Sequence, residues 1–314
     1  MKYTLIIGGA GFIGANLTRA FLKHNARVII YSEIHDNNRN LDEINDQILV
    51  IQGKFNQVEK LAEIFKKYEI ERIIHLVSGL IPSSNKEDFI NEYNDVIIPT
   101  LELMKLMTKY NTKDLVYLSS GGTVYGNHKS NGVYVEIDKL EPINYYGLSK
   151  LHLEEVITFE CKKNNLNYLI LRPSNPFGRF QNIFGKQGLI PVVIGKVLND
   201  EEIDIWGDGT IIRDYIPIDF LTNAIVQLSL LGFKNEVINV GSGIGYSVID
   251  IVEMIERIAC KTIKKNYLPN RSVDSDIVIL NIEKLKSLMD IDKIDIEESI
   301  RNYFIHVKES FDEQ

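Results

Sequence analysis

A glycine-rich turn near the start of the chain constrains the fold more than any other stretch. Residues 4–7 form a short apolar run that ends at Gly8-Gly9-Ala10-Gly11-Phe12-Ile13-Gly14. Such a run before a glycine cluster is typical of a buried parallel strand that enters a tight turn. The chain is then predicted to continue as a helix, because apolar residues recur on one side from Phe12 to Leu22.

The spacing of the glycines indicates what this turn could bind. Gly8, Gly11 and Gly14 lie three residues apart. One glycine would form the turn, one would let a backbone approach a pyrophosphate, and one would let helix and strand pack closely. The N–H groups at the helix start, near Phe12 and Ile13, would face the anion. Because a strand precedes the motif and a helix follows it, we predict a dinucleotide site here rather than an ordinary strand–turn–helix corner.

Length and composition limit the class of protein. The 314 residues allow one large or two moderate domains, and 45% hydrophobic with 25% charged residues is ordinary for a globular chain. The net charge of -8 and the absence of a Lys or Arg run argue against a nucleic-acid partner. Cys161 and Cys260 lack metal-ligand spacing, so no metal site is expected. The chain starts directly with a strand and has no apolar run near ~18 residues, so we expect no membrane partner and a cytoplasmic location.

Strands and helices alternate from residue 3 to residue 172, which predicts an α/β fold with a Rossmann-like doubly wound parallel sheet. The predicted later strands are 27–31, 48–52, 72–76 and 114–118, and the predicted helices are 58–68, 88–110 and 145–164. Strict alternation is lost after Phe177. We therefore predict a cofactor-binding domain over 1–175, to which 215–240 returns, and a smaller mixed α/β C-terminal lobe over 176–314 that closes a ligand cleft.

The end of the second predicted strand bears on the choice of cofactor. An acid there binds the adenosine ribose of NAD, whereas an arginine accommodates the 2′-phosphate of NADP. Glu33 could bind the ribose diol, and Ser32 with Arg39 could bind a phosphate. A solvated loop is the third interpretation, so the sequence leaves this choice open. After the fourth predicted strand, the backbone at Leu76 and Val77 is expected to pass close to the cofactor.

The residues that could carry out a reaction follow the fifth predicted strand. Residues 119–126 leave its carboxyl end, which is where open α/β sheets bind ligands. Tyr146 and Lys150 lie at i and i+4 of the predicted helix 145–164, so they share one face. An ammonium group nearby stabilises a phenolate and lowers its pKa from ~10. Tyr146 could then act as a general acid or base. A surface pair at helical spacing is the alternative.

Taken together, these motifs resemble the extended short-chain dehydrogenase/reductase family, in particular its nucleotide-sugar epimerases, dehydratases and reductases. The resemblance covers nearly the whole chain. The residues that carry it are 8–14, His75-Leu76, Ser119-Ser120, Val124-Tyr125-Gly126, Tyr146-Gly147-Leu148-Ser149-Lys150, 171–178, 206–209, 213–216 and 239–242.

The resemblance implies a role for each matching residue. Tyr146 would be the catalytic acid/base, and Lys150 its electrostatic partner and a ligand of the cofactor ribose. Ser119 would lie against the cofactor. The substrate would be contacted by Tyr125, Asn175, Arg213 and Arg271, with the two arginines near its diphosphate or nucleoside. Surface pairing of Arg213 with Asp214 or Asp208, and a solvated Arg271, are the alternatives.

The resemblance also implies partners. The cofactor would be NAD, with NADP as the alternative, and the substrate a nucleotide-diphosphate sugar. Two copies of the chain would pair through helices 88–110 and 145–164, for which Leu151, Leu153, Val156, Ile157 and Phe159 supply apolar surface. Burial of some of these side chains within the chain itself is the alternative.

Departures from the family pattern reduce the number of reactions that this chain could catalyse. Gly121 falls where the family usually has its catalytic Ser or Thr, so Ser120, Thr123 or a water must supply that hydroxyl. The family's usual Asn in the helix before Thr100 is displaced, and Asn94 is the nearest candidate. Gly122 and Thr123 replace the acid pair of the dehydratases, which argues against dehydration.

Three functions therefore stay open at this point. The first is NAD-dependent C4 epimerisation of a nucleotide-diphosphate hexose through a 4-keto intermediate. The second is an NAD(P)H-dependent reductase of a nucleotide-diphosphate 4-keto-6-deoxy sugar, favoured by Ser32 in place of an acid and by Arg39. The third is a dinucleotide-sensing protein without catalysis, which the fold alone does not exclude.

Overall fold

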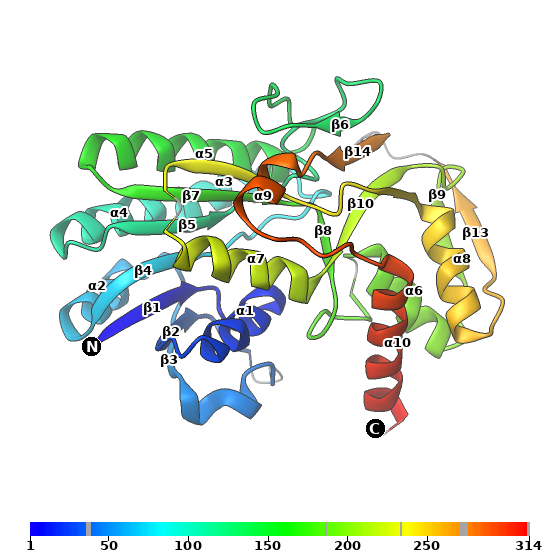
Figure 1. The fold of residues 1–314 in the computed structure, drawn as a ribbon, viewed down its shortest axis with the longest axis horizontal. Helices are drawn as coiled ribbons and strands as arrows, with labels where there is room; N and C mark the ends of the chain where they lie inside the picture. Colours follow the sequence, from blue (N-terminus) through cyan, green and yellow to red (C-terminus); the bar gives the residue numbers. More distant parts are fainter. Residues whose placement is uncertain (36–38, 186, 233, 270–275, 313–314) are drawn as a thin grey trace.

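A parallel sheet forms the centre of the computed structural model, which describes residues 1–35, 39–185, 187–232, 234–269 and 276–312. In that part of the chain the sheet has seven strands in the order β11-β7-β5-β4-β1-β2-β3 (Figure 1). The strands are β1 (Lys2–Ile7), β2 (Val28–Ser32), β3 (Leu49–Gln52), β4 (Glu69–His75), β5 (Asp114–Leu118), β7 (Asn167–Pro173) and β11 (Glu236–Val240). The predicted doubly wound α/β fold is confirmed.

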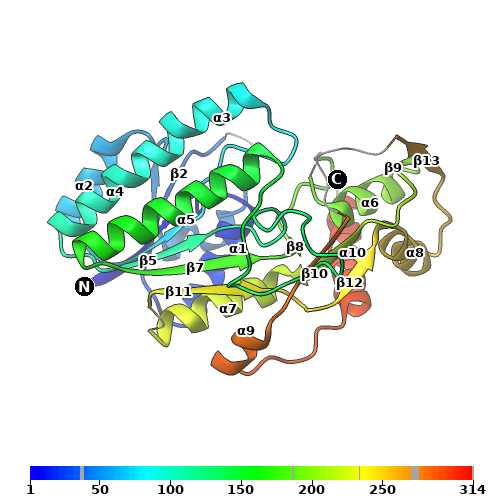
Figure 2. The ribbon, with the colours of Figure 1, turned by 90° about the horizontal axis from the view of Figure 1, so that it is seen from above.

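Helices cover both faces of this sheet, as Figure 2 shows from above. One face carries α1 (Phe12–Lys23) and α7 (Ile218–Leu230), and the other carries α2 (Val58–Lys67), α3 (Lys86–Glu92), the π-helix η2 (Tyr93–Ile97), α4 (Ile98–Lys109) and α5 (Tyr145–Asn164). Side chains of a strand alternate between the two faces. In β1, Ile6 therefore joins the core under α1, while Leu5 and Ile7 join the opposite core.

The segment 88–110 differs from the predicted single helix. It consists of α3, η2 and α4 in direct succession, and the wide turn of η2 is closed by the bond from the Ile98 N–H to the Tyr93 carbonyl. Asn85 starts α3 with a reciprocal capping box that involves Asp88. The insertion of a π turn changes which side chains face the sheet.

The C-terminal part of the chain builds a second layer with its own core. Its elements are α6 (Leu189–Leu198), β9 (Ile203–Trp206), α8 (Val248–Ala259), β13 (Lys265–Leu268) and α10 (Ile296–Asp312). A small mixed sheet joins this layer to the central sheet, and its strands are β6 (Val133–Tyr134), β8 (Asn175–Phe177), β10 (Ile212–Pro217), β12 (Gly245–Ser247) and β14 (Ile277–Leu280). The short helices η1 (Asp42–Gln47) and α9 (Glu283–Leu288) complete the described elements.

The chain passes repeatedly between these parts. α7 and β11 belong to the central sheet and its core, and residues from β14 to Met289 pack on that same core. The division at residue 175 stays a prediction. The arrangement places the small mixed sheet across the carboxyl ends of the central strands (Figure 1).

The strand order fixes where a ligand site can form. β1 lies between β2 and β4, so the chain reverses direction across the sheet at this point. A crevice at the carboxyl ends of the strands is the usual ligand site of such sheets. No helix in the described ranges is long and apolar enough to cross a membrane.

Candidate active site

The glycine turn after β1 has the shape that a pyrophosphate needs. Gly8 has φ +84°, a conformation that favours glycine. A Cβ at Gly14 would lie 2.5 Å from the Gly9 Cα and 2.6 Å from the Gly8 carbonyl oxygen, so only glycine lets α1 pack on the turn. A Cβ at Gly11 would make only an ordinary contact, 3.5 Å from the Gly8 oxygen. Gly11 caps α1 without any side-chain bond, so the turn is open where α1 presents its N–H groups.

The predicted contacts after β4 lie beside this turn. The Leu76 N–H donates to the Ile7 carbonyl at 3.1 Å. The Val77 Cγ2 would be 3.3 Å from a Cβ at Gly8. Leu76 and Val77 therefore stand beside the glycine turn, at the switch point between β1 and β4.

A cleft of about 410 Å³ continues from Val77 toward the end of β2. Glu33 lines it and makes a long ion pair of 4.0 Å with Lys54. Ser32 is buried, and its hydroxyl donates to the Glu33 carbonyl at 3.2 Å. Arg39 is exposed, just before η1. Of the three interpretations of this strand end, the one based on Glu33 thus has its side chain at the cleft.

Tyr146 is placed by the first turn of α5. The Asn144 side chain caps this helix by accepting from the Gly147 N–H at 2.8 Å. A Cβ at Gly147 would lie 2.6 Å from the Thr123 carbonyl oxygen, so glycine allows the helix to start directly against residues 119–126. The Ser120 hydroxyl hydrogen-bonds the Tyr146 phenol oxygen as a result.

Lys150 lies one turn further along α5, beneath Tyr146. Its side chain is 3% exposed, and Nζ donates to the Leu118 carbonyl at 3.0 Å. Nζ is 5.6 Å from the centroid of the Tyr146 ring and 5.3 Å from that of Tyr117. Burial lowers the pKa of Lys150 to about 8, and the carboxylates of Glu92 and Glu154 oppose that shift.

The expected lowering of the Tyr146 pKa is not found. Burial raises the pKa of this phenol, and the hydrogen bond from Ser120 only partly offsets the rise. The physical reason is desolvation, which penalises the phenolate in a low-dielectric site. A group near the phenol that carries positive charge must therefore compensate before Tyr146 can act as a base.

Of the candidate hydroxyls, the structure places that of Ser120 beside Tyr146. At Gly121, the family's usual position, a Cβ would lie 2.6 Å from the Leu280 Cδ1 and 3.0 Å from the Arg172 carbonyl oxygen, so a side chain there would require the end of the Leu280 side chain to move. Ser120 supplies the hydroxyl that bonds Tyr146. The Thr123 Oγ1 is buried and has no hydrogen-bond partner among the described residues.

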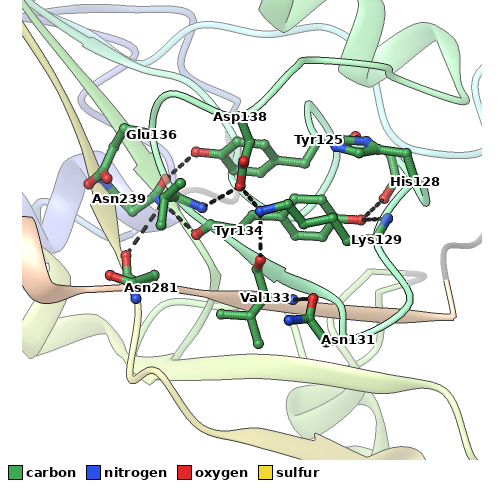
Figure 3. A network of polar contacts seen from close by, with 12 residues as sticks. Tyr125, His128, Lys129, Asn131, Val133, Tyr134, Glu136, Asp138, Asn239 and Asn281 are labelled. Carbon is green, nitrogen blue, oxygen red and sulfur yellow. Dashed lines mark hydrogen bonds and ion pairs between the residues drawn. The ribbon is translucent and has the colours of Figure 1, made fainter.

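The predicted contact of Tyr125 with the substrate does not match the structure. Tyr125 is fully buried, and its hydroxyl donates to the Asn239 side chain at 2.6 Å and accepts from Arg172 at 2.9 Å. Figure 3 shows it inside the network that joins Asn239 to the backbone of Tyr134. Its ring stacks on the Tyr134 ring, with centroids 4.9 Å apart. Tyr125 is therefore a core residue and does not reach the cleft.

Ser119 has a similar internal role. Its hydroxyl donates to Glu154, and the Arg172 guanidinium donates to the same carboxylate at 3.0 and 2.6 Å. All three side chains are buried. A contact of Ser119 with the cofactor would thus fall to its main chain.

The predicted substrate residues lie on the small mixed sheet. The Asn175 amide donates to the Asp214 carbonyl at 2.8 Å. A Cβ at Gly122 would be 3.8 Å from the Asn175 Oδ1 and 4.0 Å from the Ser120 Oγ, so both side chains flank one point of the site. Arg213 is half-buried on β10 and donates to the Ile212 carbonyl at 2.9 Å. Arg271 lies outside the described residues.

A buried aspartate fixes β10 at this place. The Asp214 carboxylate accepts from the Ser242 N–H at 2.8 Å, the Gly243 N–H at 3.1 Å and the Leu280 N–H at 3.2 Å. Burial raises the pKa of Asp214 against these bonds. Because side chains alternate along a strand, the anchored Asp214 sends its neighbour Arg213 to the other face.

The sequence analysis missed Glu92, the last residue of α3. It is 3% exposed and faces the Lys150 region, whereas Asn94, the expected candidate, is exposed to solvent. A charged residue on the inward stripe of a helix was the available signal. Within the described ranges, no group of three or more His, Cys, Asp or Glu residues could hold a metal ion.

Comparisons with known proteins show to which family the sequence is similar. Residues 4–241 match the model of the NAD dependent epimerase/dehydratase family. A dTDP-4-dehydro-6-deoxyglucose reductase from Escherichia coli is 32% identical over 80% of each chain. A UDP-glucose 4-epimerase from Lactobacillus helveticus is 27% identical over 91% of this chain and 90% of that one.

A solved structure extends the likeness to the whole fold. The crystal structure of a UDP-glucose 4-epimerase from Thermotoga maritima, with UDP-glucose, superposes with a TM-score of 0.92. It is 26% identical and covers 99% of this chain and 100% of that one. The glycine turn, the helix with Tyr146 and Lys150 and nearly all of the parallel sheet lie within the matched residues 4–241. This chain therefore belongs to the NAD dependent epimerase/dehydratase family, among the extended short-chain dehydrogenases/reductases.

Proposed function

We propose that this protein is an NAD-dependent epimerase that inverts C4 of a nucleotide-diphosphate hexose through a 4-keto intermediate. The observation that carries the proposal is the Tyr146 phenol, held by Ser120 and placed over Lys150. This pair can move one proton on and off a sugar hydroxyl. The similarity to the two UDP-glucose 4-epimerases supports the same reaction class.

The residues near the turn fit the cofactor of the family. The N–H groups at the start of α1 and the open side of Gly11 suit a pyrophosphate. Glu33 would accept from the adenosine ribose, and Lys150 would donate to the ribose of the nicotinamide. When bound, NAD supplies the hydride chemistry at C4 of the sugar.

The proton at the sugar hydroxyl is the task of the chain itself. Tyr146 would take the proton from O4 as the C4 hydroxyl becomes a ketone, and return it when the hydroxyl re-forms. The hydrogen bond from Ser120 and the ammonium of Lys150 stabilise the phenolate in the intervening state.

The small mixed sheet would hold the substrate for inversion. Asn175 would contact the sugar, and Arg213 the diphosphate, because a guanidinium forms paired bonds with phosphate oxygens. Arg271 is proposed as the second cation on the sequence resemblance alone. An anchor at the diphosphate would let the 4-keto sugar turn its other face to the hydride.

The first test is the nucleotide that the purified protein carries. An epimerase regenerates its cofactor in place, so about one equivalent of NAD should be released on denaturation. UDP- and dTDP-hexoses should then be interconverted at C4, followed by NMR. Tyr146→Phe should lower the rate by about 10²–10⁴-fold, whereas Tyr145→Phe, the adjacent phenol, should keep it.

One observation favours a reductase as the second candidate. The relative from Escherichia coli, at 32% identity, is a dTDP-4-dehydro-6-deoxyglucose reductase. A reductase must exchange its nicotinamide in every turnover. A protein that is purified empty and consumes NAD(P)H with a nucleotide-diphosphate 4-keto-6-deoxy sugar would contradict the epimerase proposal. A protein that binds NAD but turns over neither substrate would contradict both.

We also propose that two copies pair through α3, α4 and α5. Leu153 and Ile157, which were expected at that interface, are buried within the chain itself. Phe159 is 64% exposed on α5, and Ile90 and Ile98 are 52% and 47% exposed on α3 and α4. Large apolar side chains on neighbouring helices are typical of a protein interface.

A further inference from the structure

Glu92 is a carboxylate buried beside the active site, and the mechanism above does not use it. Its Oε2 accepts from the Gly79 N–H at 2.9 Å, and its Oε1 accepts from the Ser78 hydroxyl at 3.2 Å and the Ser149 hydroxyl at 3.4 Å. These donors are all neutral. A buried carboxylate without a directly bonded cation is costly, so a nearby charge must compensate it.

The compensating charge is the ammonium of Lys150. Ser149, which bonds Glu92, directly precedes Lys150 on α5, and Glu92 is the first carboxylate that opposes the lowering of the Lys150 pKa by burial. The negative charge of Glu92 raises the pKa of Lys150 and also that of Tyr146. Both effects have the same sign because a carboxylate favours an ammonium and disfavours a phenolate.

The helix register places Glu92 on the side of the helix that faces the interior. It continues an inward stripe in which the side chains at i+4, i+8, i+11 and i+15 are buried: Val96, Thr100, Leu103 and Met107. The next acid along the helix, Asp95, is exposed. The π-helix η2 starts directly after Glu92, and π turns occur frequently at functional sites.

Other titratable groups around the pair do not replace this charge. On β4, burial lowers the pKa of His75 to about 3, so its imidazole is neutral. On β5, burial raises the pKa of Tyr117 well above its ordinary value. On α5, Glu154 is bonded by the Arg172 guanidinium. Glu92 thus differs from Glu154: among the described contacts, no arginine forms an ion pair with its carboxylate.

We propose that Glu92 is a positioning residue that sets the pH range in which Lys150 is an ammonium and Tyr146 can ionise. The effect of Glu92 on catalysis rests on the proposed function, whereas its effect on Lys150 does not. Without Glu92, Lys150 would lose its proton at lower pH, and Tyr146 would ionise at lower pH. Both limbs of the pH profile would move in the acid direction together.

The direct test measures Lys150 without any substrate. The protein is labelled with a trace of acetic anhydride across a pH series, and peptide mass spectrometry gives the rate at Lys150, which follows the neutral amine. Glu92→Gln should lower the midpoint by roughly 0.5–1 unit. Glu92→Asp, which keeps the charge but withdraws it by one methylene, should lower it less.

The control is Glu87→Gln, the same chemical change on the same helix but at an exposed position. Water screens that charge, so the Lys150 midpoint should not move. Circular dichroism and melting curves establish that each variant is folded. If Glu92→Gln does not fold, Glu92→Asp alone tests the direction of the shift.

The pH profile of kcat/KM gives the second readout. Both limbs should shift to lower pH in Glu92→Gln by the amount seen in the labelling. A Lys150 midpoint in Glu92→Gln equal to that of Glu87→Gln would overturn the proposal and leave Glu92 as an acceptor for the Ser78–Gly79 turn. If no variant, the unaltered protein included, shows turnover, the proposed function fails, while the labelling still decides the role of Glu92.

Discussion

At the scale of single residues, the reactivity of Tyr146 depends on a few neighbours that act against burial. Burial raises the pKa of the phenol, and the Ser120 hydroxyl opposes that shift. Desolvation also makes Lys150 easier to deprotonate. The site is therefore not a strong base in isolation. Its charge balance depends on hydrogen bonds and carboxylates whose removal should change the pH profile before it changes the fold.

Ser120 should matter more than Thr123. Ser120→Ala removes the hydrogen bond that lowers the Tyr146 pKa, so the acid limb of the kcat profile should move to higher pH. A hydrogen bond to a charged group is worth about 1.5–3 kcal/mol, so kcat should fall roughly 10- to 100-fold. Steady-state kinetics over a pH series would measure both effects.

Thr123→Val is the matched control, because the Thr123 Oγ1 is buried without a partner among the described residues. Removing an unpaired buried hydroxyl is neutral or stabilising, and the kinetics should stay near those of the unaltered protein. A larger loss of kcat in Thr123→Val than in Ser120→Ala would assign the catalytic hydroxyl to Thr123 instead.

Lys150 should give opposite pH trends in activity and stability. Its ammonium is present below about pH 8 and is lost above it, so kcat/KM should fall as the pH rises through 8. The unfolded chain holds this proton up to a pKa of ~10.4. Between these values the unfolded state binds more protons, so the free energy of unfolding rises with pH.

Urea unfolding of the protein and of Lys150→Met at pH 7.5 and pH 10 would isolate this contribution. The buried lysine should add about 2 kcal/mol of stability between the two pH values, and Lys150→Met should lack that increment. Identical pH dependence in the two proteins would mean that Lys150 titrates at its ordinary pKa.

At the scale of elements, two glycines of the turn after β1 have different roles: Gly14 is needed for the stability of the fold, and Gly11 for the binding of NAD. A Cβ at Gly14 would lie 2.5 Å from backbone at Gly9, so Gly14→Ala should destabilise the fold by about 2 kcal/mol or more. A Cβ at Gly11 would meet only an ordinary contact. Gly11→Ala should melt like the unaltered protein and yet bind NAD at least roughly 10-fold more weakly, because its methyl group fills the open side of the turn.

Melting curves and NAD titration calorimetry of both variants would check this pair. Normal NAD affinity in a stable Gly11→Ala protein would place the pyrophosphate elsewhere. A stable Gly14→Ala protein would show that α1 can move away from the turn.

Elements with strong local signals could be predicted from the sequence, and α5 is the clearest case. Its predicted bounds, 145–164, match because Asn144 caps its start and Asn165, in the left-handed region, ends it. The segment 88–110 was predicted less well, because apolar periodicity does not reveal the extra residue of a π turn. The short strands β8, β10, β12 and β14 pair with segments distant in sequence, so no local pattern indicates them.

The site shows the same limit. Tyr146, Lys150 and the glycine turn follow from spacing within one helix or one turn. The burial of Tyr125 and the inward position of Glu92 depend on which segments pack against them, namely β11 with Asn239 and α5 with Ser149. Sequence patterns within one element do not contain that information.

At the scale of the whole molecule, the helices on the α4–α5 face present apolar side chains that the chain itself does not cover. Phe159, Ile90 and Ile98 remain largely exposed after folding. The opposite face of the sheet is closed by α1 and α7 (Figure 2). If two copies pair through the exposed face, each active site keeps its own Tyr146 and Lys150, and pairing would stabilise α5, which carries both.

Light scattering with size-exclusion chromatography should find the mass of two chains for the unaltered protein. Phe159→Glu would place a carboxylate in the apolar contact and should raise the dissociation constant at least roughly 10-fold. Phe184→Glu is the matched control, because Phe184 is 63% exposed, close to the 64% of Phe159, but lies in the segment before α6. It should leave the mass of two chains unchanged. A single-chain mass for the unaltered protein at all concentrations, or equal effects of the two substitutions, would contradict pairing through this face.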